Sequence, residues 1–253
     1  MNLFDEVESN IETKSFRYNP WHGCFKVSVG CKNCFIYTID SMHQKDSKNI
    51  YKTKNFYLPI IKNRSGNYKI PSNSFVWMCF SSDFLLKEAD LWRNEVWEMI
   101  AKRKDVEFAF FTKRIERLES CLPDDWGDGY KNVIVGLSVE NQVLADKRLP
   151  IFINLPIKRR WIIAAPLLEA LKLEKYLQRN KIEAVGVGGE RALNARICDY
   201  SWVLDIRGQC ERAGVGFYFH QTGSRFKKDN KIYKIKNYLQ QSQAKKAGID
   251  IEI

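Results

Sequence analysis

Three cysteines near the start of the sequence have the spacing of a metal centre. Cys24, Cys31 and Cys34 form the pattern C-x6-C-x2-C within residues 19–34. A glycine precedes each of the first two cysteines and allows the loop to fold back, so that three thiolates can converge on one site. The last two cysteines stand at the expected start of a helix, where the positive end of the helix dipole favours a thiolate or an anionic cluster. The segment is therefore predicted to bind a metal.

The number of cysteines bears on which metal is bound. A structural zinc site is usually closed by four protein ligands, and His22 or His43 would be the nearest source of the fourth. A [4Fe–4S] cluster with three cysteine ligands instead leaves one iron open to a further ligand. The count of three favours the cluster, while the spacing alone leaves zinc as the alternative.

The four remaining cysteines are Cys79, Cys121, Cys198 and Cys210. They stand singly in apolar or helical stretches and are predicted to be ordinary buried thiols. Clustered cysteines next to isolated ones are typical of a reducing compartment. No apolar run approaches the ~20 residues that cross a bilayer, and the acidic start MNLFDEVESN lacks the pattern of a signal peptide. A cytoplasmic location is expected.

The cysteine loop must be positioned by a larger fold, and the rest of the chain alternates β-like runs with helical stretches. The predicted strands are residues 15–18, 75–80, 106–111, 133–137, 160–164, 184–187 and 216–219. The predicted helices include residues 83–104, 167–178 and 200–213. Because helices separate strands that are almost entirely apolar, the sheet is expected to be parallel and covered on both faces. This alternation predicts an α/β fold, a full or partial (β/α) barrel formed as one domain over residues 1–253, with a doubly wound open sheet as the alternative.

Polar residues and glycines follow the ends of five predicted strands. They are Ser82, Asp83, Lys113, Arg114, Ser138, Glu140, Asn141, Gly188, Gly189, Glu190 and His220. In a β/α barrel the carboxyl ends of the strands form one rim, where catalytic groups gather. Helix capping would explain Ser82, Asp83 and Thr112 equally well, but it does not explain the basic residues of this set.

The net charge of +11 is concentrated in two segments. Residues 43–69 hold seven Lys or Arg and one Asp, and residues 225–253 hold eight Lys or Arg and three acidic residues. Four aromatic residues are interleaved with the first group: Tyr51, Phe56, Tyr57 and Tyr68. Basic side chains can bind phosphates while rings stack on bases, so DNA or RNA is an expected partner. The alternatives are solvated basic loops and rings that anchor residues 44–74, a basic insertion, to the core.

The cysteine segment and seven later motifs resemble a known family. Residues 19–34 are similar to the N-P-(T/W)-x-G-C-x-K-V-S-x-G-C-x-N-C pattern of a phage-associated, radical-SAM-like family of unknown function. The later matches are residues 81–84 (SSDF), 111–114 (FTKR), 138–142 (SVENQ), 165–168 (APLL), 187–190 (VGGE) followed by Arg196, 210–214 (CERAG) and 217–223 (FYFHQTG). The chain differs from the family at Phe35, Ala165 and His220, where the family has tyrosine, glutamate and lysine.

The resemblance implies a barrel of the radical S-adenosylmethionine (radical-SAM) type, with a [4Fe–4S] cluster on Cys24, Cys31 and Cys34. It implies S-adenosylmethionine as second cofactor and an external electron donor. The implied cofactor contacts are Ser82, Asp83, Ser138, Asn141, Gly188, Gly189 and Glu190, and the implied catalytic residues are Lys113, Arg114, Glu140 and His220. Reductive cleavage of the cofactor would give a 5′-deoxyadenosyl radical that abstracts hydrogen from a substrate. Modification or repair of nucleic acid, or of a nucleotide, is the expected activity.

Two other functions stay open at this point. One is a nucleic-acid-binding module with a structural zinc ion and no turnover. The other is a partner-dependent, non-catalytic component that docks another protein through residues 126–130 (WGDGY) or through the C-terminal appendage, residues 225–253. The identity of the metal separates the enzyme from the zinc-binding module.

Overall fold

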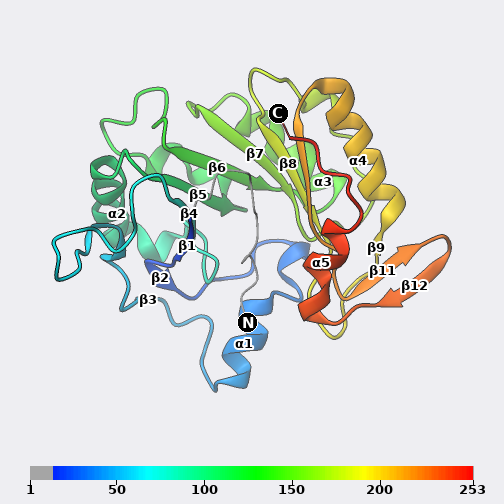
Figure 1. Ribbon diagram of the computed structural model, residues 1–253, viewed down its shortest axis with the longest axis horizontal. Helices are drawn as coiled ribbons and strands as arrows, with labels where there is room; N and C mark the ends of the chain where they lie inside the picture. The colour runs from blue at the N-terminus through cyan, green and yellow to red at the C-terminus, as the bar shows by residue number, and fades with distance from the viewer. Residues whose placement is uncertain (1–13, 253) are drawn as a thin grey trace.

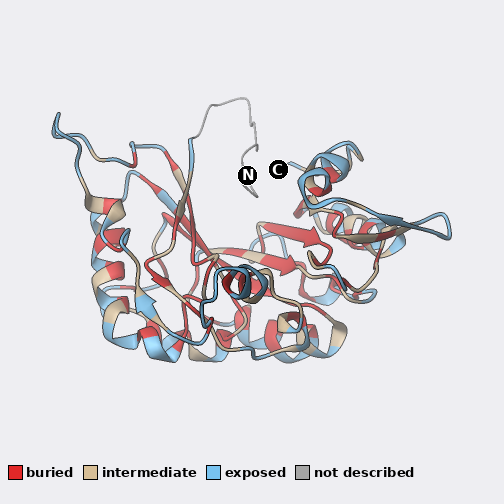
Figure 2. Cartoon of the chain, turned by 90° about the horizontal axis from the view of Figure 1, so that it is seen from below, coloured by how far each residue is buried: buried red, intermediate tan, exposed pale blue. Residues whose placement is uncertain are grey.

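A parallel sheet of seven strands forms the centre of the computed structural model, which describes residues 14–252 (Figure 1). The strands, in their order across the sheet, are β1 (Ser15–Tyr18), β4 (Phe75–Met78), β5 (Glu107–Thr112), β6 (Val133–Ser138), β7 (Arg159–Ala164), β8 (Ala184–Gly188) and β10 (Gly216–Gln221). Every neighbouring pair is parallel. The sheet curls in one direction into a half-barrel, whose edges among the described residues are β1 and β10 (Figure 2).

The half-barrel agrees with the predicted partial β/α barrel and not with the doubly wound alternative. In a doubly wound sheet the strand order reverses at a switch point, whereas here the order across the sheet follows the order along the chain. All seven predicted strands are present, and their ends differ from the predicted ones by no more than two residues. Burial explains this agreement, because a strand covered on both faces is recognisable as a continuous apolar run. In β6 every residue is buried.

Helices cover the convex face of the sheet. The longer helices on this face are α2 (Asp90–Lys102), α3 (Gln142–Phe152) and α4 (Tyr200–Ala213), whereas α1 (Phe35–Met42) lies at the mouth of the half-barrel. The short 3-10 helices of the described residues are η1 (Val29–Cys31), η2 (Leu58–Ile60), η3 (Lys87–Ala89), η4 (Ile115–Arg117), η5 (Glu119–Cys121), η6 (Glu174–Tyr176) and η7 (Asn237–Leu239). Val96 and Ile100 of α2 and Ile206 of α4 are fully buried. Their spacing of three or four residues places the apolar side chains of each helix on the face toward the sheet. Helix α4 ends as predicted at Gly214, whose φ of 65° is readily adopted by glycine.

Aromatic rings alternate with small residues on the concave face. Trp77 pairs with Ala109 on the next strand, and Phe111 pairs with Gly136. A Cβ atom at residue 136 would stand 2.2 Å from Cδ1 of Phe111, so the glycine makes room for the ring. The layer continues with Trp161, whose ring centroid lies 6.0 Å from that of Trp77. The hollow of the half-barrel is therefore walled by aromatic side chains.

The predicted helix over residues 167–178 is wrong. A short 3-10 helix, η6 (Glu174–Tyr176), is the only helical element described in this range. The backbone N–H of Leu167 donates to the carbonyl of Gly188 on β8 at 2.8 Å. The side chain of Gln209 on α4 occupies further backbone groups of the stretch. Because these groups bond to other elements, they do not form the turns of a helix.

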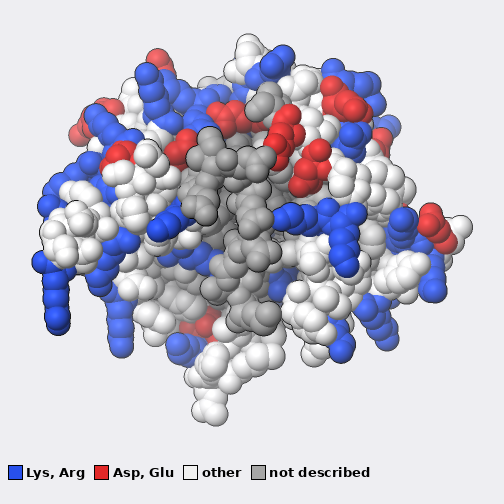
Figure 3. Space-filling view, in the orientation of Figure 1, with Lys and Arg blue, Asp and Glu red and all other residues white. Residues whose placement is uncertain are grey.

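The two basic segments fold against opposite ends of the sheet (Figure 1). The first contains β3 (Tyr51–Lys52), which pairs with β2 (Trp21–His22). The second follows β9 (Cys198–Asp199) and α4, and consists of β11 (Arg225–Lys228), β12 (Lys231–Lys234) and α5 (Gln240–Lys245). Figure 3 shows Lys and Arg side chains on both flanks of this face. Among residues 14–252, no helix has the length and apolar character needed to cross a membrane.

The aromatic residues of the first basic segment divide into two pairs. Phe56 is buried, and Tyr68 lies under the guanidinium of Arg103, 4.1 Å from the ring centroid. These two rings anchor the segment to the core. Tyr51 and Tyr57 are 39 % and 49 % exposed, so this pair offers a partner more surface than Phe56 and Tyr68 do.

Trp126 and Tyr130 of residues 126–130 pack inward, whereas Gly127 and Asp128 between them are exposed. Trp126 is buried, and its ring lies 5.1 Å from that of Trp97 and 4.8 Å from that of Tyr130. Its indole nitrogen donates to the carbonyl of Pro156. The tryptophan of the expected docking segment therefore stabilises the fold beside α2.

Candidate functional site

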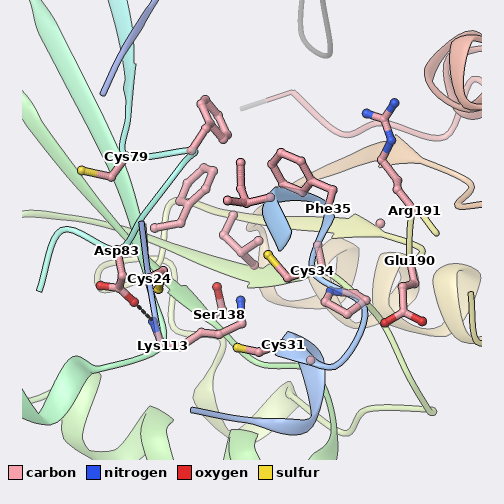
Figure 4. A pocket seen from close by; sticks show the side chains of 18 of the residues that line it. Cys24, Cys31, Cys34, Phe35, Cys79, Asp83, Lys113, Ser138, Glu190 and Arg191 are labelled. Carbon is pink, nitrogen blue, oxygen red and sulfur yellow. Dashed lines mark hydrogen bonds between the residues drawn. The ribbon is translucent and has the colours of Figure 1, made fainter. Parts of the chain in front are cut away.

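One cavity of about 260 Å³ lies at the carboxyl ends of the strands. It brings together the three clustered cysteines and nine of the eleven predicted rim residues (Figure 4). These nine are Ser82, Asp83, Lys113, Arg114, Ser138, Gly188, Gly189, Glu190 and His220. Glu140 and Asn141 do not line it. Asn141 caps α3, because its Oδ1 accepts a hydrogen bond of 3.0 Å from the backbone N–H of Leu144.

The loop after β1 carries the cysteines to this cavity. Gly23 has a φ of 93°, and its N–H donates to the carbonyl of Ser81 at 3.1 Å. This glycine turns the chain directly before Cys24. Cys31 ends η1, and Cys34 is the N-cap residue of α1. Figure 4 shows the three thiols at the same end of the pocket.

The Cys24 thiol faces the guanidinium of Arg114. Both Nη1 and Nη2 of Arg114 lie 3.7 Å from Sγ of Cys24. Burial raises the pKa of Cys24 to about 11, and the positive charge of Arg114 acts in the opposite direction. Asp83 fixes the guanidinium, since it accepts hydrogen bonds from Arg114 at 2.9 Å and from Thr112 Oγ1 at 2.8 Å. Arg114 is therefore placed to stabilise negative charge at Cys24.

Cys34 has a second set of stabilising neighbours. Burial raises its pKa, whereas the backbone N–H groups of Ile36 and Tyr37 and the charge of Lys113 lower it. The two N–H groups belong to the first turn of α1, where the helix dipole also favours negative charge. The Nζ atom of Lys113 lies 3.8 Å from Glu140 Oε1 as well. Two cations thus lie beside the cysteine loop, one near each end.

Glu140 lies behind the cysteine loop and is fully buried. Its carboxylate accepts hydrogen bonds from Ser28 Oγ at 2.5 Å and from Arg148 Nη1 at 2.8 Å. The same Ser28 hydroxyl is 3.7 Å from Sγ of Cys31. Sequence reasoning assigned Glu140 a catalytic role, but in the structure it fixes the loop and does not line the cavity.

Glu190 holds the other part of the loop. Its Oε2 accepts hydrogen bonds from Asn33 Nδ2 at 2.9 Å and from the backbone N–H of Arg196 at 2.8 Å, and the Arg196 side chain completes an ion pair. Burial alone would raise the pKa of Glu190, but the bonds from Arg196 and Asn33 lower it. Asn33 stands between Cys31 and Cys34, so an ionised carboxylate positions this part of the motif.

His220 forms part of the cavity wall without carrying a charge at neutral pH. Burial lowers its pKa from 6.5 to about 4. A Cβ atom at Gly186 would stand 2.4 Å from Nε2 of His220, so the imidazole lies against a bare stretch of β8. Its plane is within 15° of the Tyr218 ring, at 6.3 Å. A neutral imidazole at this place can donate or accept one hydrogen bond at each nitrogen.

A family model described as a protein of unknown function, DUF5131, matches residues 8–252. The chain belongs to the DUF5131 family. No curated protein and no solved structure matches it. The match spans all of the motifs from residue 18 to residue 224 and carries no activity with it. Radical-SAM chemistry and a phage association of this DUF5131 protein therefore stay predictions.

The cavity of this DUF5131 protein offers three cysteine thiols as possible metal ligands. Within residues 14–252, no group of three His, Cys, Asp or Glu side chains is arranged to hold a metal ion. His22, an expected fourth zinc ligand, has Nε2 at 3.0 Å from both carboxylate oxygens of Asp40. Thiols beside cations are the chemistry that an anionic cluster needs.

Phe35, Cys79 and Arg191 are among the residues that line the cavity but that sequence reasoning did not assign to the site. All four isolated cysteines are buried as predicted, but Cys79, with a φ of 59°, is both buried and part of the wall. Arg191 directly follows the GGE motif, and Cys79 is the residue after β4. Including one more residue after the GGE motif would have found Arg191, whereas Cys79 lies inside the predicted strand 75–80 and has no such signal.

Proposed function

We propose that this DUF5131 protein is an iron–sulfur, S-adenosylmethionine-dependent radical enzyme that acts on nucleic acid or on a nucleotide. One observation carries the proposal: Cys24, Cys31 and Cys34 line a single cavity at the carboxyl ends of the strands of a half-barrel. Three protein thiols leave one iron of a [4Fe–4S] cluster for a second ligand. The motif resemblance from residue 18 to residue 224 supports the same reading.

When bound and reduced, such a cluster supplies the electron that cleaves S-adenosylmethionine to methionine and a 5′-deoxyadenosyl radical. The electron comes from an external donor. The residues of the chain would bind and orient the cofactor and the substrate, and they would exclude water from the site. Arg114 and Lys113 offset the negative charge of the thiolates, because both stand beside the cysteine loop. Glu140 and Glu190 keep that loop in place.

The proposed cofactor contacts are cavity residues near the ends of three strands. Ser82 lies beyond the end of β4, Ser138 ends β6, Gly188 ends β8, and Gly189 and Glu190 follow it. The carboxylate of Glu190 already accepts hydrogen bonds from Asn33 and Arg196, so it is a less suitable contact than the two serines. Asp83 is a less suitable contact than its position suggests, since its carboxylate already accepts four protein hydrogen bonds. Asn141 is a helix cap outside the cavity.

The hollow below the cysteines suits radical chemistry. Trp77, Phe80, Phe111 and Ile163 line it with apolar surface. A site that excludes water protects a reactive intermediate from side reactions. The basic segments, residues 43–69 and 225–253, fold against opposite ends of the sheet (Figure 1) and supply the charge that favours a polyanionic substrate.

The test is a metal count and a spectrum. The protein is purified without oxygen, iron, sulfide and zinc are measured, and EPR spectra are recorded after dithionite reduction with and without S-adenosylmethionine. We expect about four irons per chain and a spectrum that changes when the cofactor is added. Cys31→Ser should lose the iron, whereas Cys121→Ser, at a buried thiol outside the cavity, should retain it. One tightly held zinc and no iron would refute the proposal.

A further inference from the structure

Arg191 presents a hydrogen-bond donor without a partner at the edge of the cavity. Its Nη1 atom is buried and has no partner among the described residues, while Nη2 makes a long contact of 3.5 Å with the carbonyl of Asn237. Buried N–H groups in native proteins nearly always have partners, and an exception indicates a ligand or a functional role. Burial and the nearby charge of Arg17 lower the pKa of Arg191 to about 10, so the guanidinium is still charged at pH 7. An anionic group would satisfy it.

Part of the wall of the cavity is aromatic. Phe35 at the start of α1, Trp77 on β4 and Phe111 on β5 all line it. The Trp77 and Phe111 centroids are 5.7 Å apart, with planes inclined at 55°. In Figure 4 the labelled Phe35 and Arg191 lie at the end of the pocket away from Cys24 and Cys31. A flat, apolar ring system with an anionic group at one side matches this arrangement.

We infer that the cavity receives one unpaired nucleotide, whose base packs against Phe35, Trp77 and Phe111 and whose phosphate binds Arg191. The inference rests on the proposed function, because that function makes the nucleotide the substrate. A guanidinium matches the geometry of a phosphate through two parallel N–H donors. Stacking on aromatic side chains accepts any base, since every base has a flat face.

Stacking on the aromatic wall requires the base to be unpaired. The faces of a base within a duplex are covered by its neighbours, so only a base that has left the stack can offer a face to Phe35, Trp77 or Phe111. The nucleotide is therefore free, part of a single strand, or flipped out of a helix. In a strand, neighbouring phosphates would meet the Lys and Arg side chains on both flanks of this face (Figure 3).

A competition assay tests the phosphate contact. The full-length protein is bound to a fluorescein-labelled single strand of about 12 nucleotides, a length within the usual site size, and is challenged with a nucleoside or its 5′-monophosphate. Wild-type protein should prefer the monophosphate by about tenfold or more, as expected for a charge-assisted contact. Arg191→Ala should lose this preference, and Arg191→Lys, which preserves the charge but not the paired donors, should keep part of it. Arg179→Ala, at an exposed arginine before β8, should behave as wild type.

Several outcomes would overturn the inference. The inference fails if the wild-type protein binds nucleoside and monophosphate equally well, or if Arg191→Ala still prefers the monophosphate. It also fails if a duplex competes as well as the matching single strand. A single strand that competes better than the monophosphate assigns the nucleotide to a strand, and equal competition assigns it to the free pool; both results support the inference.

The assay separates this inference from the proposed function, because binding requires neither iron nor turnover. An iron-free protein whose Arg191→Ala variant loses the phosphate preference would refute the radical enzyme and support the nucleotide site. An iron-loaded protein whose EPR spectrum responds to S-adenosylmethionine, but which does not prefer the monophosphate, would do the reverse.

Discussion

Gly30 lies directly against the buried carboxylate of Glu140, and a Cβ atom at residue 30 would stand 2.5 Å from Glu140 Oε1. The same oxygen accepts the hydrogen bond from Ser28, two residues earlier in the loop. Cys31 follows Gly30 directly. The position of the middle thiol therefore depends on close contact between a residue without a side chain and a carboxylate that is fixed on three sides.

Gly30→Ala should displace the cysteine loop. Overpacking of this kind costs about 1–3 kcal/mol, and the loop is the element free to move away. We expect reduced iron per chain after anaerobic reconstitution and a lower midpoint of thermal unfolding. Gly208→Ala in α4 is the matched control and should stabilise the helix by up to about 1 kcal/mol. Full iron content in Gly30→Ala would show that the contact does not set the position of the loop.

Glu140→Gln should lower the free energy of unfolding by about 3 kcal/mol, because it leaves the buried Arg148 without its charged partner. Urea unfolding of the metal-free protein measures the change. Glu174→Gln breaks an exposed ion pair with Arg212 and should change stability by less than about 1 kcal/mol. Similar losses of unfolding free energy in the two variants would mean that the buried ion pair stabilises the protein no more than the exposed one.

His220 should make the protein less stable in mild acid. Its pKa falls from 6.5 to about 4 on folding, so between these pH values the unfolded chain binds a proton that the folded chain does not. Stability is therefore lost as the pH drops through this window, by up to about 3 kcal/mol from this group. Unfolding of His220→Gln should depend less on pH between 6.5 and 4 than wild type. His43→Gln, at an exposed position after α1, should follow the wild-type curve.

The β11–β12 hairpin should contribute to nucleic-acid binding that depends on salt. All four residues of β12 are exposed, including Lys231 and Lys234. Replacing both by alanine should reduce the slope of log K against log salt by about 1.4 for a single strand, if each binds one phosphate. The control is Lys104→Ala with Arg179→Ala, two exposed residues that precede β5 and β8 at the amino ends of the strands. An unchanged slope would remove the hairpin from the interface.

Much of the fold could be predicted because its determinants are local. A strand such as β6, buried along its whole length, is visible as an apolar run, and the residue after it lies at the rim. The path that the chain takes after the end of a strand is not determined by neighbouring residues alone. Ser138 faces the cavity, yet Glu140, two residues later, turns behind the cysteine loop because Ser28 and Arg148 bind it there.

The missed features depend on contacts between distant residues. The stretch after β7 does not form the expected helix, because its N–H and carbonyl groups meet β8 and α4. The unpartnered donor of Arg191 is likewise a property of the assembled structure: its neighbours determine both its burial and its lack of a hydrogen bond. No pattern of residue types along the chain contains that information.

Strands β1 and β10 remain unpaired with each other within residues 14–252, and this has a consequence for access. A closed barrel is a tube, entered through one of its ends. A sheet with two separate edges is a trough, and a long molecule can be laid into it sideways. Under the proposed function, a polymer without free ends, such as a circular chromosome with a short melted stretch, would reach the floor of the trough and leave it without being cut or threaded.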